Sequence, residues 1–122
     1  MNCYAKDLIV VANIIDSNLN IEKRQVRDIF MGSNSQFFLK PVALQPNNEA
    51  RSIFNTKIVG LTESRIQSYW AQMRFSGRSK PPQEFDSIDS LLTYLKDHKD
   101  TVAYLPVDTE LPDGLVIIYK TE

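Results

Sequence analysis

The sequence predicts a single three-layer α/β domain, in which a mixed sheet is covered by helices on both faces. A length of 122 residues suggests one domain. Leu8–Ala12 is the longest unbroken apolar run; it is rich in β-branched residues and short for a buried helix, so it indicates an interior strand. Strand and helix patterns alternate after it, which favours parallel pairing of the first strands through right-handed crossovers.

The first half of the chain carries two helix signals and a second strand. Asn20 is expected to cap a helix over Ile21–Met31, whose apolar residues recur at helical spacing. Phe37–Leu44 is expected to form the second strand, and Pro41 within it implies an edge position or a missing ladder bond. A second helix is expected over Asn48–Val59.

The second half is predicted to contain two more helices and two more strands. Thr62 is a suitable cap for a helix that ends at Phe75–Gly77. The polar segment Arg78–Glu84 is expected to be an extended loop. A fourth amphipathic helix follows, capped by Asp86 or Ser87. The last two strands are expected over Thr101–Leu105 and Leu115–Tyr119.

Composition and motifs exclude several function classes. His98 is the only histidine and Cys3 the only cysteine, so neither a Ser-His-Asp triad nor a conventional zinc site is expected. No phosphate loop or dinucleotide fingerprint is present. The net charge of −1 gives no overall footprint for nucleic acid, and no run has the length of a membrane-spanning helix. We therefore expect no enzyme, no cofactor, no nucleic-acid partner and no membrane insertion.

The first residues carry a localisation signal. Cys3-Tyr4-Ala5, followed by Lys6-Asp7, is similar to the end of a secretory signal with small residues at the cleavage position. Residues 1–5 are therefore a possible signal-peptide remnant, and residues 6–122 form the domain. The alternative is that residues 1–5 are an ordinary loose N-terminus.

The turn after the second strand is the best candidate for a binding site. A strand-to-helix turn presents unpaired backbone N–H groups at the positive end of the helix dipole, which suits an oxyanion. Asn47 and Asn48 supply donors beside Gln45, and Arg51 lies one turn into the helix. The predicted ligand-binding residues are therefore Gln45, Asn47, Asn48 and Arg51. In the alternative interpretation, an asparagine merely caps the helix and Arg51 is a surface residue.

Several short segments together resemble a known family. They are Leu8–Asn13, Asp28–Gly32, Pro41-Val42, Arg51–Phe54, Ser68–Trp70, Phe75–Gly77, Pro81-Pro82 and Val102–Leu105. In this order they are similar to the phosphate-type substrate-binding proteins of ABC transporters. The resemblance implies one lobe of a type II periplasmic-binding-protein-like fold, export to the periplasm, and binding of phosphate or a related oxyanion without catalysis. A membrane transporter or sensor is the implied partner.

The chain departs from this family in two respects. Family members are about twice as long and hold the ligand between two lobes, so a homodimer is one way to rebuild a cleft. Leu44 stands where the family carries an arginine, and Asn48-Glu49-Ala50 stands where it carries a Ser-Gly-Thr stretch. These departures leave an alternative function open, which is a degenerate lobe that binds a protein instead of a solute. Its candidate contact surfaces are the Asp108–Asp113 and Arg74–Lys80 loops.

Overall fold

The computed structural model describes residues 7–33 and 36–121. The expected signal-peptide remnant, residues 1–5, lies outside the described residues. The strands are β1 (Leu8–Ala12), β2 (Lys40–Leu44), β3 (Gln83–Phe85), β4 (Thr101–Pro106) and β5 (Val116–Lys120). The helices are α1 (Lys23–Phe30), α2 (Glu49–Phe54), the π-helix η1 (Asn55–Val59), α3 (Glu63–Phe75) and α4 (Ile88–Asp97).

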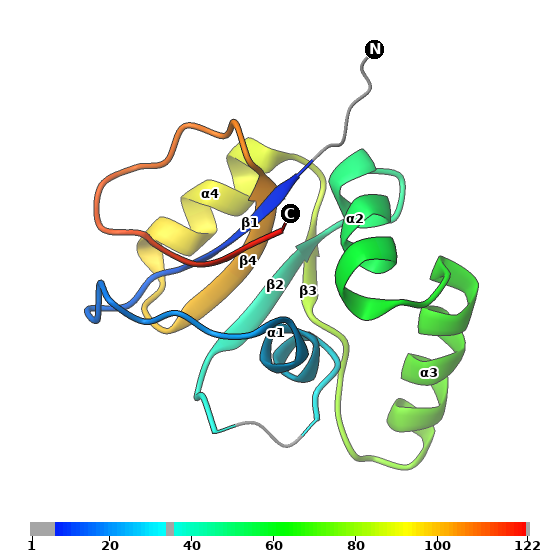
Figure 1. Ribbon diagram of the computed structural model, residues 1–122. Coiled ribbons are helices and arrows are strands. Elements are labelled where there is room, and N and C mark those ends of the chain that lie inside the picture. Colours follow the sequence, from blue (N-terminus) through cyan, green and yellow to red (C-terminus); the bar gives the residue numbers. More distant parts are fainter. Residues whose placement is uncertain (1–6, 34–35, 122) are drawn as a thin grey trace.

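The predicted three-layer arrangement with a mixed sheet is confirmed. The five strands lie in the order β3-β2-β4-β1-β5. β2 runs parallel to β3 and β4, whereas β1 runs antiparallel to β4 and β5. α1 and α2 lie on one face of the sheet and α4 lies on the other (Figure 1). Every residue of β1 is buried, as its apolar run predicts.

The predicted parallel pairing of the first two strands is wrong. β4 lies between β1 and β2, and it pairs antiparallel with β1 from Leu8–Pro106 to Ala12–Val102. β1 therefore ends at the edge of the sheet where β2 begins. Parallel pairing would require a crossover that returns the chain over the length of β1 before β2 begins. α1 has eight residues and is only about 12 Å long, which is too short for that return.

Two predicted boundaries shift, and a long-range contact explains the first of them. Ile21 stays extended, since its N–H donates to Ile118 O on β5 at 2.9 Å. α1 consequently begins later than predicted, with Glu22 rather than Asn20 as its cap and Gln25 completing a capping box. β2 begins only at Lys40, and Phe38 ahead of it is 92% exposed.

Pro41 fits the second of the two expectations, a missing ladder bond, whereas the segment before α4 differs from its prediction. β2 is an interior strand, not an edge, and Pro41 pairs with Val102 at a point where β3 has not yet begun. The predicted loop over 78–84 ends in β3, whose three residues form the edge of the sheet beside β2. The predicted helix over 48–59 is confirmed, although its second half is π-helical and ends at Gly60 with φ of 78°.

Candidate functional site

The carboxyl ends of the parallel strands meet at one edge of the sheet. β2 is followed by Gln45–Asn48, β3 by Asp86-Ser87 and β4 by Val107-Asp108. Ligands of open α/β sheets bind outside such ends. All the predicted binding residues lie here, at the turn between β2 and α2 (Figure 1).

The turn itself is built by ordinary helix-start bonds. Gln45 N–H donates to Phe85 O on β3 at 3.1 Å, which ties the turn to the neighbouring strand. The Asn48 side-chain oxygen accepts the Ala50 N–H at 2.9 Å and caps α2. The side chains of Gln45 and Asn47 are exposed. The structure therefore leaves the amides of Gln45 and Asn47 facing solvent, whereas the Asn48 oxygen serves the helix.

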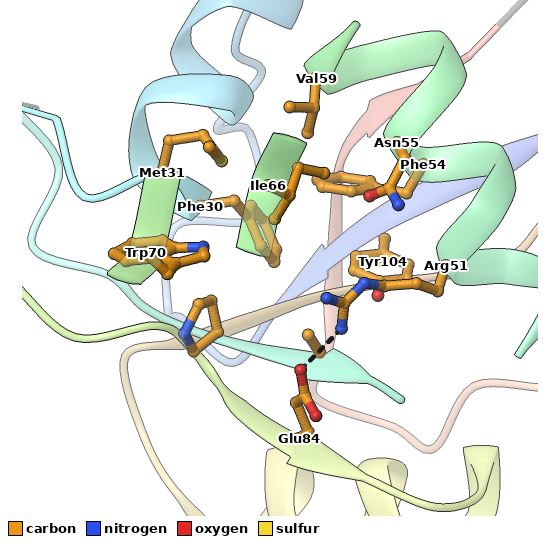
Figure 2. Close-up of a pocket in the computed structure, with 12 residues that line it drawn as sticks. Phe30, Met31, Arg51, Phe54, Asn55, Val59, Ile66, Trp70, Glu84 and Tyr104 are labelled. Carbon is orange, nitrogen blue, oxygen red and sulfur yellow. Dashed lines mark hydrogen bonds and ion pairs between the residues drawn. The ribbon is translucent and has the colours of Figure 1, made fainter. Parts of the chain in front are cut away.

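Arg51 is buried, with 7% of the residue exposed, so it is not the surface residue of the alternative interpretation. Its Nη1 donates to Leu44 O at 2.8 Å and to Glu84 at 2.9 Å. Its Nε and Nη2 donate to the two oxygens of Glu63 at 3.0 and 2.7 Å. Figure 2 shows the guanidinium pointing to Glu84, below Tyr104. Four of the five N–H donors of Arg51 thus have protein acceptors.

The protonation equilibria of this cluster reflect the same pairing. Burial alone would lower the pKa of Arg51, but hydrogen bonds to Glu84 and Glu63 outweigh it and raise that pKa. Burial likewise favours a higher pKa for Glu63, but hydrogen bonds from Gln67, Asn55 and Arg51 reverse the effect and lower it. Burial raises the pKa of Tyr104 to about 12, although its hydroxyl is hydrogen-bonded to Leu44. Arg51 and Glu63 are therefore both charged near neutral pH.

The charge around the turn disfavours an anion. One guanidinium faces the carboxylates of Glu63 and Glu84, so this cluster carries a net negative charge. A hollow of about 440 Å³ lies between the start of α2 and the end of β4, and Asp7, Glu49 and Asp108 contribute to its wall. Lys57 does not line this hollow, but its ammonium group forms a 3.1 Å ion pair with Asp7, which does. The residues around this hollow therefore include three carboxylates, one of which is paired with Lys57.

A second, smaller cavity lies behind Arg51. Its volume is about 40 Å³, and Arg51, Asn55 and Glu84 form its polar side, whereas aromatic and aliphatic side chains form the remainder (Figure 2). A cavity of this size holds one or two waters but no organic ligand. We therefore interpret it as a small void next to the ion pairs of Arg51 and not as a ligand site.

Sequence reasoning missed Glu63 and Glu84 because both lie far from Arg51 along the chain. Glu63 has a local explanation as an acidic residue in the first turn of α3. Glu84 lies in a strand that the sequence did not predict. Among the described residues, no group of three or more His, Cys, Asp or Glu side chains is arranged to hold a metal ion. In the same part of the chain, no helix is long and apolar enough to cross a membrane.

Comparison with known proteins gives a clear result at the level of the fold. No family model matches the chain, and no curated protein matches its sequence. An ABC-type phosphate transport receptor from Vibrio cholerae superposes with a TM-score of 0.65 at 14% identity, covering 93% of this chain and 46% of the receptor. A putative phosphate ABC transporter substrate-binding protein from Clostridium perfringens, with bound phosphate, gives 0.65 at 11% identity, covering 93% of this chain and 44% of that protein.

A third structure, PstS from Borrelia burgdorferi, superposes with a TM-score of 0.57 at 8% identity, covering 84% of this chain and 41% of PstS. The chain spans less than half the length of each of these proteins. Identities this low describe the fold alone. The chain therefore has the fold of a phosphate-type substrate-binding protein of ABC transporters, in a form that corresponds to a single lobe.

Proposed function

We propose that this chain is an exported, non-catalytic binding module of the phosphate-receptor fold that has lost free-oxyanion capture and binds a protein partner instead. The observation that carries the proposal is the pairing of four of the five N–H donors of Arg51 with Leu44 O, Glu63 and Glu84. The carboxylates of Glu63 and Glu84 accept the hydrogen bonds that the guanidinium would otherwise donate to a bound oxyanion. Two side chains of the protein thus take the place of the ligand.

Export and domain boundaries form part of this proposal. The fold is that of proteins described as phosphate transport receptors and substrate-binding proteins. It supports a periplasmic location, with residues 1–5 as a signal-peptide remnant and residues 6–122 as the domain. The partner in this proposal is a membrane transporter or sensor, and the exposed acidic loop Asp108–Asp113 is a contact surface for it.

Capture of phosphate by Gln45, Asn47, Asn48 and Arg51 is the second candidate function. The fold similarity favours it, as do the exposed amides of Gln45 and Asn47 at the carboxyl end of the sheet. An anion would have to displace at least one carboxylate from Arg51 to reach the guanidinium. A second copy of the chain facing this edge would be needed to enclose it.

Calorimetric titration of phosphate and sulfate separates the two candidates. We expect no heat from the wild-type chain and a gain of weak binding in the Glu63→Gln/Glu84→Gln variant, in which Arg51 becomes the only charge of its cluster. The control variant, Glu110→Gln/Asp113→Asn, removes two negative charges from the exposed β4–β5 loop and should stay silent. Saturable wild-type binding that Arg51→Gln abolishes would establish the second candidate and overturn the first.

The protein-binding half of the proposal has its own readout. A photo-crosslinking side chain at Asp108, used in the periplasm of producing cells, should give a discrete adduct, and the same probe at Lys96 on α4 should not. Absence of any adduct specific to Asp108 would contradict the proposed contact surface.

A further inference from the structure

Two phenylalanines project from the end of the molecule opposite the candidate site. Phe38 is 92% exposed in the segment before β2, and Phe75 is 93% exposed at the end of α3. Single exposed apolar residues are common on protein surfaces. Two aromatic rings that are almost wholly exposed at one end of a 122-residue chain make that end a candidate contact surface.

Contacts between their two segments place these rings at the same end. A Cβ atom added to Gly32, at the start of the first segment, would lie 2.5 Å from Ser79 Oγ in the second. A groove of about 270 Å³ runs between the segments, with Phe37 from the first and Lys80 from the second among its lining residues. Both segments form the lower end of the molecule in Figure 1.

The segment from the end of α3 to Lys80 is locally basic. Arg74, Arg78 and Lys80 are exposed, and none of them forms an ion pair within residues 7–33 and 36–121. Asp28 on α1 is half-buried nearby. The net charge of −1 thus averages a basic end against the acidic carboxyl edge, and it conceals a local cationic surface.

We propose that this basic–aromatic end, made of Phe38, Phe75, Arg74, Arg78 and Lys80, docks the protein on an anionic membrane surface. Aromatic rings insert at the headgroup boundary, while arginine and lysine pair with anionic phospholipids around them. Docking is peripheral, because no described helix can span a bilayer. Charge complementarity selects anionic lipid, and projection of the two rings from separate segments suits insertion into a soft interface better than contact with a rigid protein surface.

Vesicle co-sedimentation of the full chain tests the proposal. The wild type should bind vesicles of phosphatidylglycerol and phosphatidylethanolamine, and should remain in the supernatant with phosphatidylcholine vesicles. Since each cation near an anionic surface is worth about a fivefold change in partitioning, Arg78→Gln/Lys80→Gln should weaken binding about 25-fold. Phe38→Ser/Phe75→Ser should weaken binding at high salt as well as at low salt, because ring insertion is not screened.

Matched controls locate the effect on the surface. Val107→Ser removes an exposed apolar side chain at the opposite edge of the sheet, just after β4. Arg65→Gln/Lys120→Gln removes two exposed cations from the start of α3 and the end of β5, away from this end. Both controls should bind as the wild type does, and circular dichroism should show every variant folded. No binding to anionic vesicles, or equal losses in test and control variants, would overturn the proposal. These results are independent of the proposed function, because they do not depend on whether the guanidinium of Arg51 is paired with Glu63 and Glu84.

Discussion

Arg51 donates four hydrogen bonds to protein acceptors from a position that is 7% exposed. Removing one partner of a buried ion pair leaves the other charge unpaired and costs about 3–5 kcal/mol. Arg51 therefore fastens α2 to β2, β3 and α3 through Leu44, Glu84 and Glu63. A side chain with this structural role is a poor ligand for a solute that comes and goes.

Glu63 provides a pH test at the residue scale. Its folded-state pKa is lowered below the ordinary 4.5, so its stabilising effect is complete above about pH 5. That effect is lost as the pH falls from 4.5 through the folded-state pKa, because the unfolded chain then binds the proton more tightly. In Glu63→Gln, the free energy of unfolding should fall less steeply than in the wild type as the pH is lowered over this range. Urea denaturation at a series of pH values measures this.

A control variant separates this effect from a general loss of charge. Glu110→Gln removes one exposed carboxylate in the β4–β5 loop. If Glu63→Gln retained the full wild-type acid slope, the lowered pKa of Glu63 would not be the origin of that slope.

α2 shows how a short helix is positioned at the scale of the element. Asn48 caps its first turn, and the π-helical η1 continues it to Gly60. The Asn48 oxygen accepts the Ala50 N–H at 2.9 Å, so the same atom is not free to orient a ligand. Capping thus accounts for the position of the Asn48 side chain, whereas its Nδ2 amide is the group that would donate to an oxyanion.

Two adjacent asparagines test this assignment. Asn48→Ala should lower the free energy of unfolding by about 1 kcal/mol, and Asn48→Ser should restore most of it. The exposed Asn47 has no side-chain hydrogen bond among the described residues, so Asn47→Ala should change stability by less than about 0.5 kcal/mol. Equal losses at both positions, in thermal and urea unfolding, would show that Asn48 is not a specific cap.

Sequence reasoning succeeded where the signal was local. Thr62 and Gly60 mark the boundary between η1 and α3, and Ser87 is one of the two caps predicted for α4. It failed where partners are distant in the chain. Ile21 leaves α1 for Ile118, and Arg51 pairs with Glu63 and Glu84. The strand order and these long-range pairs leave no periodic pattern in the sequence. Both depend on which surfaces of the helices and strands come together when the chain folds.

The whole molecule has two chemically different ends. The carboxyl edge of the parallel strands is acidic, with Asp7, Glu49 and Asp108 around a hollow. The opposite end carries Phe38, Phe75 and three cations that form no ion pair in the part of the chain that the structure describes. The chain spans less than half the length of the phosphate receptors whose fold it shares, and an acidic edge of this kind does not favour an anion. In our proposal, this lobe therefore acts through surfaces rather than through an enclosed solute.

The Nε–Hε resonance of Arg51 in a ¹⁵N–¹H spectrum reports most directly whether the guanidinium is occupied. Arg51→Lys assigns the signal. We predict that millimolar phosphate leaves its position unchanged in the wild type, because Glu63 already accepts the Nε hydrogen bond at 3.0 Å. In Glu63→Gln/Glu84→Gln the same titration should move it. A saturable shift of the wild-type resonance with phosphate would contradict the internal pairing and restore oxyanion capture as the function.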